Sequence, residues 1–155
     1  MKKYELTAES IVMLGRTLFR IKALVAFGDV KEGEFGGFVE KDENLDQSGD
    51  AWVFGDAQVF GGARVSGDAR VFGDAQIFKM SHYLVVGPLG SRDDFTTFFR
   101  TKHLAIGIKC GCFKGDIDQF FEAVEKTHGN NKHARAYKAA IALAKLQIDL
   151  NEYPL

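Results

Sequence analysis

The sequence predicts a mainly β fold: a short β-helix of hexapeptide repeats, with a β cap before it and an α+β module after it. The first observation is a six-residue repeat from Ala51 to Phe78, which reads AWVFGD, AQVFGG, ARVSGD, ARVFGD, AQIF. The second is a set of short apolar runs between turn residues before the repeat, and the third is helical spacing of apolar residues near the end. These observations divide the chain into a cap (1–38), a β-helix (39–80) and a module of three strands and two helices (81–155).

Each hexad contains a four-residue strand and a two-residue corner. Side chains alternate between the two faces of a strand, so Ala51 and Val53 share one face while Trp52 and Phe54 share the other. The Gly-Asp pair that follows suits a tight bend, because glycine accepts a positive φ and aspartate can hydrogen-bond nearby backbone.

Three hexads are expected to complete one coil, so that residues eighteen apart stack. Val53 then lies beside Val71, and Val59 lies beside Ile77, in a thin interior that small alanines help to fill. Such an arrangement has room for about two coils, which is short for a repeat architecture that gains stability by stacking.

Upstream of the clear repeats, the pattern is weaker. Val39 and Leu45 fall in the alanine position of the hexad, and Lys41 and Gln47 fall in the valine position. The sequence therefore predicts a degenerate first coil.

The outward positions of the hexads are unusually aromatic. Contiguous exposed aromatic residues mark contacts, so these rings are expected either to pack under the terminal segments or another subunit, or to meet a foreign partner. Because the repeat is also short, we expect a homo-oligomer, either a trimer or a dimer. The residues of this expected interface are Trp52, Phe54, Phe60, Phe72 and Phe78.

Both flanks have recognisable local signals. In the N-terminal flank, Leu14-Gly15-Arg16 between apolar runs predicts a hairpin. In the C-terminal flank, strands are expected at 83–87, 95–100 and 104–109. Asp116 is a plausible helix N-cap, with Gln119 completing a capping box. The first predicted helix has an apolar face made by Ile117, Phe120, Phe121 and Val124. A second helix is predicted from about 132 to 150, and its inner face is made by Tyr137, Ile141, Ala144 and Ile148.

Composition sets broad limits. The chain has 155 residues and a net charge of −1, so it has no overall attraction to nucleic acid or membranes. No apolar run approaches a membrane span, and the start lacks the apolar stretch of a signal peptide. Cys110 and Cys112 lie one residue apart, a poor spacing for a disulfide, so we expect a reducing, cytoplasmic setting.

The sequence gives only weak support to three kinds of catalytic or metal chemistry. Cys110 and Cys112 with a histidine could bind zinc, but the spacing is one residue and no second pair exists. Cys112 and His128 could form a nucleophile pair, although the sequence does not bring them together. An acyltransferase would need a histidine within the repeat, and none is there. We therefore expect no catalytic residue, no metal and no cofactor.

A loop in the C-terminal module is the best candidate for binding. Gly90-Ser91-Arg92 offers backbone N–H groups and a guanidinium that suit phosphate or carboxylate. Basic residues also surround the turn between the two helices, where the second helix presents its positive end. If the two regions lie on the same side, they form an anion pocket; otherwise they are a locally bonded loop and a solvated helix start. The predicted binding residues are Ser91, Arg92, Arg100, His128, Lys132, His133 and Arg135.

The GDAxVF repeats, together with GPLGSRDDFTTFFRT and CGCFKGDIDQFFEAVEKTHGNNKHARAY, resemble a group of phage and prophage hexapeptide-repeat proteins described as polymer-forming. The resemblance implies a mobile-element origin and a left-handed β-helix, but no activity. By analogy with small phage proteins, we expect a non-enzymatic protein in the cytoplasm of an infected bacterium that occludes a host defence protein, in the manner of an anti-CRISPR protein. The alternatives are a sponge that sequesters a signalling nucleotide and a hexapeptide-repeat acyltransferase.

Overall fold

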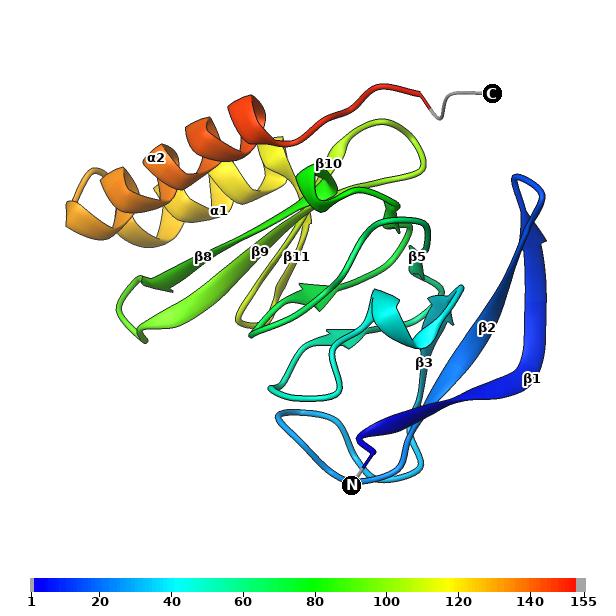
Figure 1. The fold of residues 1–155 in the computed structure, drawn as a ribbon. Coiled ribbons are helices and arrows are strands. Elements are labelled where there is room, and N and C mark those ends of the chain that lie inside the picture. The colour runs from blue at the N-terminus through cyan, green and yellow to red at the C-terminus, as the bar shows by residue number, and fades with distance from the viewer. Residues whose placement is uncertain (1, 153–155) are drawn as a thin grey trace. The chain divides into compact units, whose positions relative to one another are not determined.

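The computed structural model describes residues 2–152, so Met1 and the last three residues of the predicted C-terminal module lie outside it. The chain divides into two compact units, residues 1–80 and 81–155. Figure 1 shows the first unit in blue to green and the second in green to red. The further division of the first unit at residue 38 stays a prediction.

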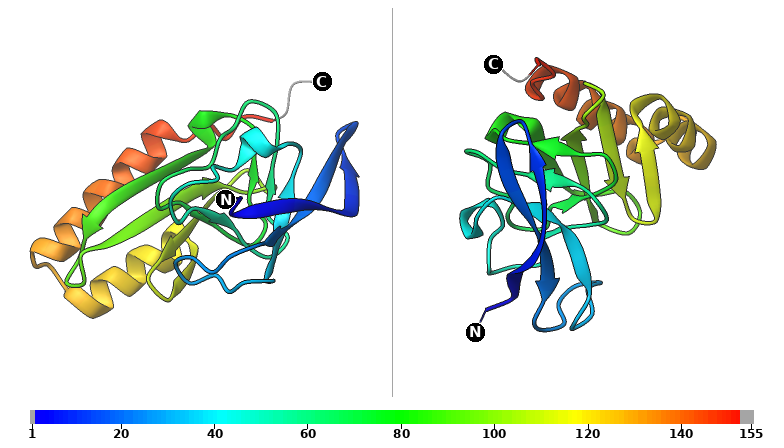
Figure 2. Two further views of the ribbon diagram at one scale, coloured as in Figure 1. Left: turned by 60° about the horizontal axis from the view of Figure 1, so that its bottom comes forward. Right: turned by 90° about the vertical axis from the view of Figure 1, so that its right-hand side faces the viewer.

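The N-terminal unit contains a five-stranded sheet with the order β1-β2-β3-β5-β7. Strands β1 (Tyr4–Met13) and β2 (Arg16–Ala23) form an antiparallel hairpin that is long in all views of Figures 1 and 2. Between them, Leu14 and Gly15 both have positive φ, at 51° and 77°, which is the geometry of a two-residue hairpin turn. The predicted hairpin is therefore confirmed.

The remaining strands of this sheet run parallel to one another. Strand β3 (Phe35–Val39) pairs with β5 (Gln58–Val59), which pairs in turn with β7 (Gln76–Ile77). A separate two-stranded parallel sheet joins β4 (Trp52–Val53) to β6 (Arg70–Val71). The predicted stacking of residues eighteen apart is confirmed for Val53 with Val71 and for Val59 with Ile77.

The predicted fold class is nevertheless wrong, because the hexads do not form a β-helix. Their strands are two residues long and are divided between two small sheets, one of which continues antiparallel into β2 and β1. The remaining side of the repeat holds only the isolated bridge between Leu45 and Val65. Such short strands cannot stand alone, so the longer hairpin and β3 complete the sheet. Residues 2–152 form small mixed, antiparallel and parallel sheets and two α-helices.

The upstream register also differs from the prediction. Val39 pairs with Val59 and Leu45 with Val65, so both residues occupy the valine position and not the alanine position. Gly37 takes the place opposite Ala57, where an added methyl group would overlap the Ala57 carbonyl oxygen. The close approach of the β3 backbone at Gly37 to that of Ala57 permits this register. Counting back in steps of six residues along the sequence does not predict it.

The aromatic positions of the hexads are mostly not exposed to water. Trp52 and Phe60 are fully buried and Phe78 is 7% exposed, so the expected aromatic surface is wrong for these three. Trp52 packs edge-on against Tyr4 and Phe27, at centroid distances of 6.1 and 5.3 Å. The N-terminal flank therefore covers this ring, which confirms for Trp52 the alternative that the rings pack under a terminal segment. The other predicted interface residues, Phe54 and Phe72, are half-buried and stack face to face at 4.1 Å.

The C-terminal unit is an antiparallel sheet with two helices on one face (Figure 1). Its strands, in the order β11-β10-β9-β8, are β8 (Tyr83–Leu89), β9 (Asp94–Arg100), β10 (Ile106–Cys110) and β11 (Phe113–Asp116). The prediction of three strands missed β11, because Gly115-Asp116 carries a helix start signal. That signal is also correct: Asp116 caps α1 (Ile117–His128) and forms the capping box with Gln119.

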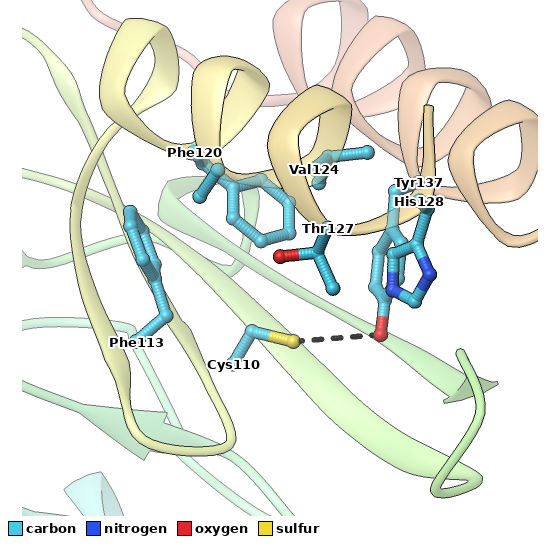
Figure 3. Close-up of a pocket in the computed structure, with 8 residues that line it drawn as sticks. Cys110, Phe113, Phe120, Val124, Thr127, His128 and Tyr137 are labelled. Atoms are coloured by element: carbon cyan, nitrogen blue, oxygen red, sulfur yellow. Dashed lines mark hydrogen bonds between the residues drawn. The ribbon is translucent and has the colours of Figure 1, made fainter. Parts of the chain in front are cut away.

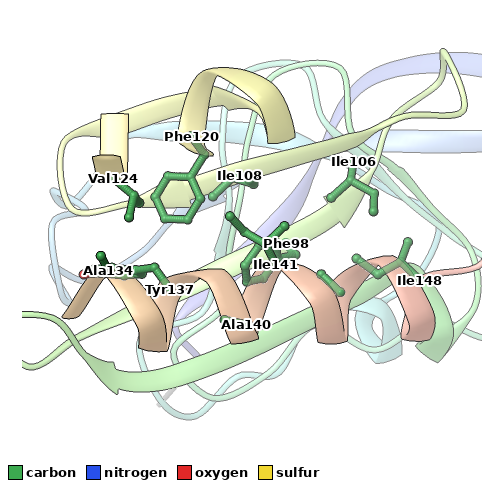
Figure 4. Close-up of a cluster of buried hydrophobic side chains, with 11 residues drawn as sticks. Phe98, Ile106, Ile108, Phe120, Val124, Ala134, Tyr137, Ala140, Ile141 and Ile148 are labelled. Atoms are coloured by element: carbon green, nitrogen blue, oxygen red, sulfur yellow. The ribbon is translucent and has the colours of Figure 1, made fainter. Parts of the chain in front are cut away.

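The core of this unit lies between the helices and the sheet (Figure 4). Helix α2 (Lys132–Gln147) presents buried Tyr137, Ile141 and Ala144, and Ile148 follows it as the C-cap residue, also buried. The predicted inner stripe is therefore confirmed. On α1, Phe120 and Val124 are buried, but Phe121 is 38% exposed and does not belong to the inner face.

Within residues 2–152, no helix is both long enough and apolar enough to cross a membrane.

Candidate functional site

Two turns and a helix end that are far apart in sequence meet at one end of the C-terminal sheet. In an antiparallel meander, alternate hairpin turns lie at the same end, so the β8–β9 loop and the β10–β11 turn are neighbours. The C-terminal end of α1 reaches the same pocket, since Thr127 and His128 line it together with residues of both turns. The strand order of the sheet therefore brings these segments together at one site.

The pocket at this end, here called the outer pocket, has a volume of about 290 Å³. This is close to the lower limit for small-molecule sites, about 300 Å³. Its lining combines a cation, a carboxylate, hydroxyls, thiols and aromatic rings. The lining residues are Ser91, Arg92, Asp94, Cys110, Gly111, Cys112, Phe113, Thr127, His128 and Tyr137.

The β8–β9 loop is a tight turn in which the Asp93 N–H donates to the Gly90 carbonyl at 3.2 Å. Ser91 and Arg92 at its tip are exposed. Gly90 lies against the Tyr137 hydroxyl, and a methyl group there would overlap it. Within the described part of the chain, Arg92 forms no ion pair, so its charge is available to an anion.

Tyr137 and His128 form an aromatic wall of the pocket. Their rings lie nearly parallel, with centroids 5.9 Å apart and an interplanar angle of 25°. Burial, and then the neighbouring Cys110 and Asp94, raise the pKa of Tyr137 above its ordinary value of 10.0, so its hydroxyl keeps its proton. A protonated phenol can donate a hydrogen bond to an anionic ligand.

The structure brings together some of the predicted binding residues and not others. Ser91, Arg92 and His128 line one pocket, as the prediction of a shared side requires. His133 lies beside His128, with ring centroids 5.4 Å apart, but is not part of the lining. Lys132 and Arg135 are exposed on the first turn of α2, outside the lining.

Arg100 does not belong to this surface, and its assignment to it is corrected. It ends the seven-residue strand β9, whereas Asp94 begins it, so about 20 Å of extended chain separates Arg100 from the pocket. Its side chain is 1% exposed, and Nη2 donates to the Asn151 carbonyl at 3.2 Å. Burial lowers the pKa of the Arg100 guanidinium, an effect that the charge of Asp149 partly offsets.

Sequence reasoning missed several lining residues, among them Tyr137, Thr127 and Asp94. Tyr137 was expected only in the core stripe, and no local signal distinguishes it there. The recognisable clue was the Gly111 turn between two strands, because its hairpin places Cys110 and Cys112 beside the Ser91 loop. Cys112 and His128 do share the pocket, and both cysteines are free.

Within residues 2–152, no group of three histidine, cysteine, aspartate or glutamate side chains could hold a metal ion. No protein-family model matches the chain, and no curated protein matches it.

Proposed function

We propose that this chain is a non-enzymatic binding protein that sequesters a small anionic ligand, of the nucleotide class, in the outer pocket of its C-terminal unit. One observation supports this proposal above the others. Ser91, Arg92 and His128, which come from two distant segments, line the same pocket. A guanidinium with adjacent loop N–H groups suits a phosphate or carboxylate group.

The pocket carries charges of both signs, which limits the class of ligand further. Asp94 also lines it, and a carboxylate would repel a ligand that is anionic throughout. Sugar hydroxyls, however, donate hydrogen bonds to a carboxylate. A ligand with an anionic group near Arg92 and hydroxyl groups near Asp94 would match both side chains. A nucleotide has this pattern, with its phosphate and its sugar hydroxyls.

Occlusion of a host protein through the hexad aromatic rings has less support. Trp52 and Phe60 are buried, and Phe78 nearly so, which leaves only the stacked pair Phe54 and Phe72 partly exposed. The phage setting rests on the sequence resemblance, the host defence target on the analogy with small phage proteins, and the cytoplasmic location also on the spacing of Cys110 and Cys112. In that setting, sequestration of a signalling nucleotide is the mode of action we propose.

Calorimetric titration with a panel of nucleoside mono-, di- and cyclic phosphates tests the proposal. Arg92→Ala should abolish or strongly weaken binding without loss of fold, because an exposed loop arginine buries little apolar area. Arg135→Ala is the matched control: it removes another exposed arginine of the same unit that does not line the pocket.

Binding by the wild type should weaken as salt increases, since exposed charges are screened. Ligand released by heating should be chemically unchanged; conversion of the ligand would contradict the non-enzymatic assignment. If Arg92→Ala binds every bound ligand as well as Arg135→Ala does, the anion pocket is not the binding site.

A further inference from the structure

A second cavity adjoins the outer pocket, and we call it the inner pocket. The two share Cys110, Phe113, Thr127, His128 and Tyr137 in their linings. The inner pocket continues past them to Phe120, Ala123 and Val124 of α1. Figure 3 shows Phe113 on one side of this space, Tyr137 and His128 on the other, and Cys110 and Thr127 between them.

The size of the inner pocket limits what can enter it. Its volume is about 130 Å³. An apolar cavity of about 150 Å³ holds a benzene molecule. The inner pocket is thus close in volume to a site for one six-membered ring and is small for a fused pair of rings.

The walls of the inner pocket suit a flat ring. The Phe120 ring meets Tyr137 edge-on, with centroids 5.5 Å apart and an interplanar angle of 85°. Phe113 lies 5.2 Å from Phe120 at an angle of 46°. Rings in these orientations offer both edges and faces, the contacts that aromatic groups prefer.

Polar groups at the junction of the two pockets are oriented by a short hydrogen-bond chain. The Thr96 hydroxyl donates to Cys110 Sγ at 3.2 Å, and the Cys110 thiol donates to the Tyr137 hydroxyl at 3.8 Å (Figure 3). The Tyr137 oxygen thus acts as acceptor toward Cys110, which directs its own hydrogen elsewhere. A carbonyl on a ligand ring could accept it.

From this arrangement we infer that the two pockets form one bipartite site for a pyrimidine nucleotide, with the base in the inner pocket and the phosphate beside Ser91 and Arg92. This inference rests on the proposed function and adds the identity of the base. Ribose lies at the junction, near Asp94. A purine nucleotide places its phosphate in the same way but leaves its larger base outside.

Titration calorimetry with three probes tests the inference: uridine monophosphate, adenosine monophosphate and ribose 5-phosphate. We expect uridine monophosphate to bind at least about tenfold more tightly than either other probe, a factor equal to about 1.4 kcal/mol. Ala123→Leu fills the inner pocket and should abolish this difference while ribose 5-phosphate binding stays unchanged. Ala139→Leu, the same change at an exposed position of α2, is the matched control.

If Ala123→Leu does not fold, the smaller change Ala123→Val fills part of the inner pocket, at a position that is not in the lining of the outer pocket. Equal binding of the three probes, or a uridine preference that survives the pocket-filling variant, overturns the bipartite site but leaves the anion pocket in place. Probes that do not bind, or whose binding does not depend on Arg92, overturn the proposed function as well. The two failures are therefore distinguishable.

Discussion

Replacing Val71 by alanine tests the packing of the hexads. Val71 is fully buried and pairs with Val53. The two-carbon truncation removes about 1.6 kcal/mol of burial free energy, at about 0.8 kcal/mol for each CH₂ group. A residual cavity adds about 1 kcal/mol if about 40 Å³ stays empty. Collapse of the cavity is restricted, because the Phe54 N–H donates to the Val71 carbonyl at 2.7 Å and thereby fixes the spacing of the strands.

The total loss of about 2.5 kcal/mol should lower the urea midpoint by roughly 1 to 2 M. Trp52 is the one tryptophan of the chain, is fully buried and pairs with Arg70 next to Val71. Its fluorescence therefore reports unfolding of the N-terminal unit, while far-UV circular dichroism follows the helices of the other unit.

Val71→Asp is the stronger form of the same test. An unpaired carboxylate in this interior costs several kcal/mol, so the N-terminal unit should unfold in buffer. Asp68→Asn, at an exposed corner of the repeat, is the control and should change stability by less than about 0.5 kcal/mol. A Val71→Asp protein with native tryptophan fluorescence would refute the assigned register.

Three further predictions concern the N-terminal unit. Gly37→Ala should destabilise it by more than about 1 kcal/mol in the same urea assay, because the new methyl group overlaps the Ala57 carbonyl, a backbone atom that cannot rotate away. Burial tends to raise the pKa of Glu40, but hydrogen bonds from Gly61 and Arg16 outweigh burial and lower this pKa below the ordinary 4.5. The ionised Glu40 therefore stabilises the folded state above pH 4.5, and this contribution is lost as the pH falls further. Glu40→Gln should flatten the dependence of unfolding free energy on pH when unfolding is measured in acid. Light scattering should detect self-association that Phe72→Asp weakens, since Phe72 is a partly exposed member of the predicted interface; an unchanged mass would remove that residue from the interface.

The sequence alone predicted features that depend on near neighbours in the chain. The six-residue spacing set which valines stack, because alternation along a strand and a glycine corner of fixed length leave one register. The Asp116 capping box and the buried stripe from Tyr137 to Ala144 are equally local, since each depends on residues within a few helical turns.

Contacts between distant segments decided the rest. The hexads are divided between two sheets, and the two-residue strands of one of them need the β1–β2 hairpin and β3 to complete a stable surface. Trp52 is buried because Tyr4 and Phe27 reach it from the flank; the aromatic row predicted that its rings would be covered, but not which residues would cover them. The candidate pocket likewise arises because alternate turns of an antiparallel sheet share an end, which joins Arg92 to His128 and places Arg100 at the other end of its strand.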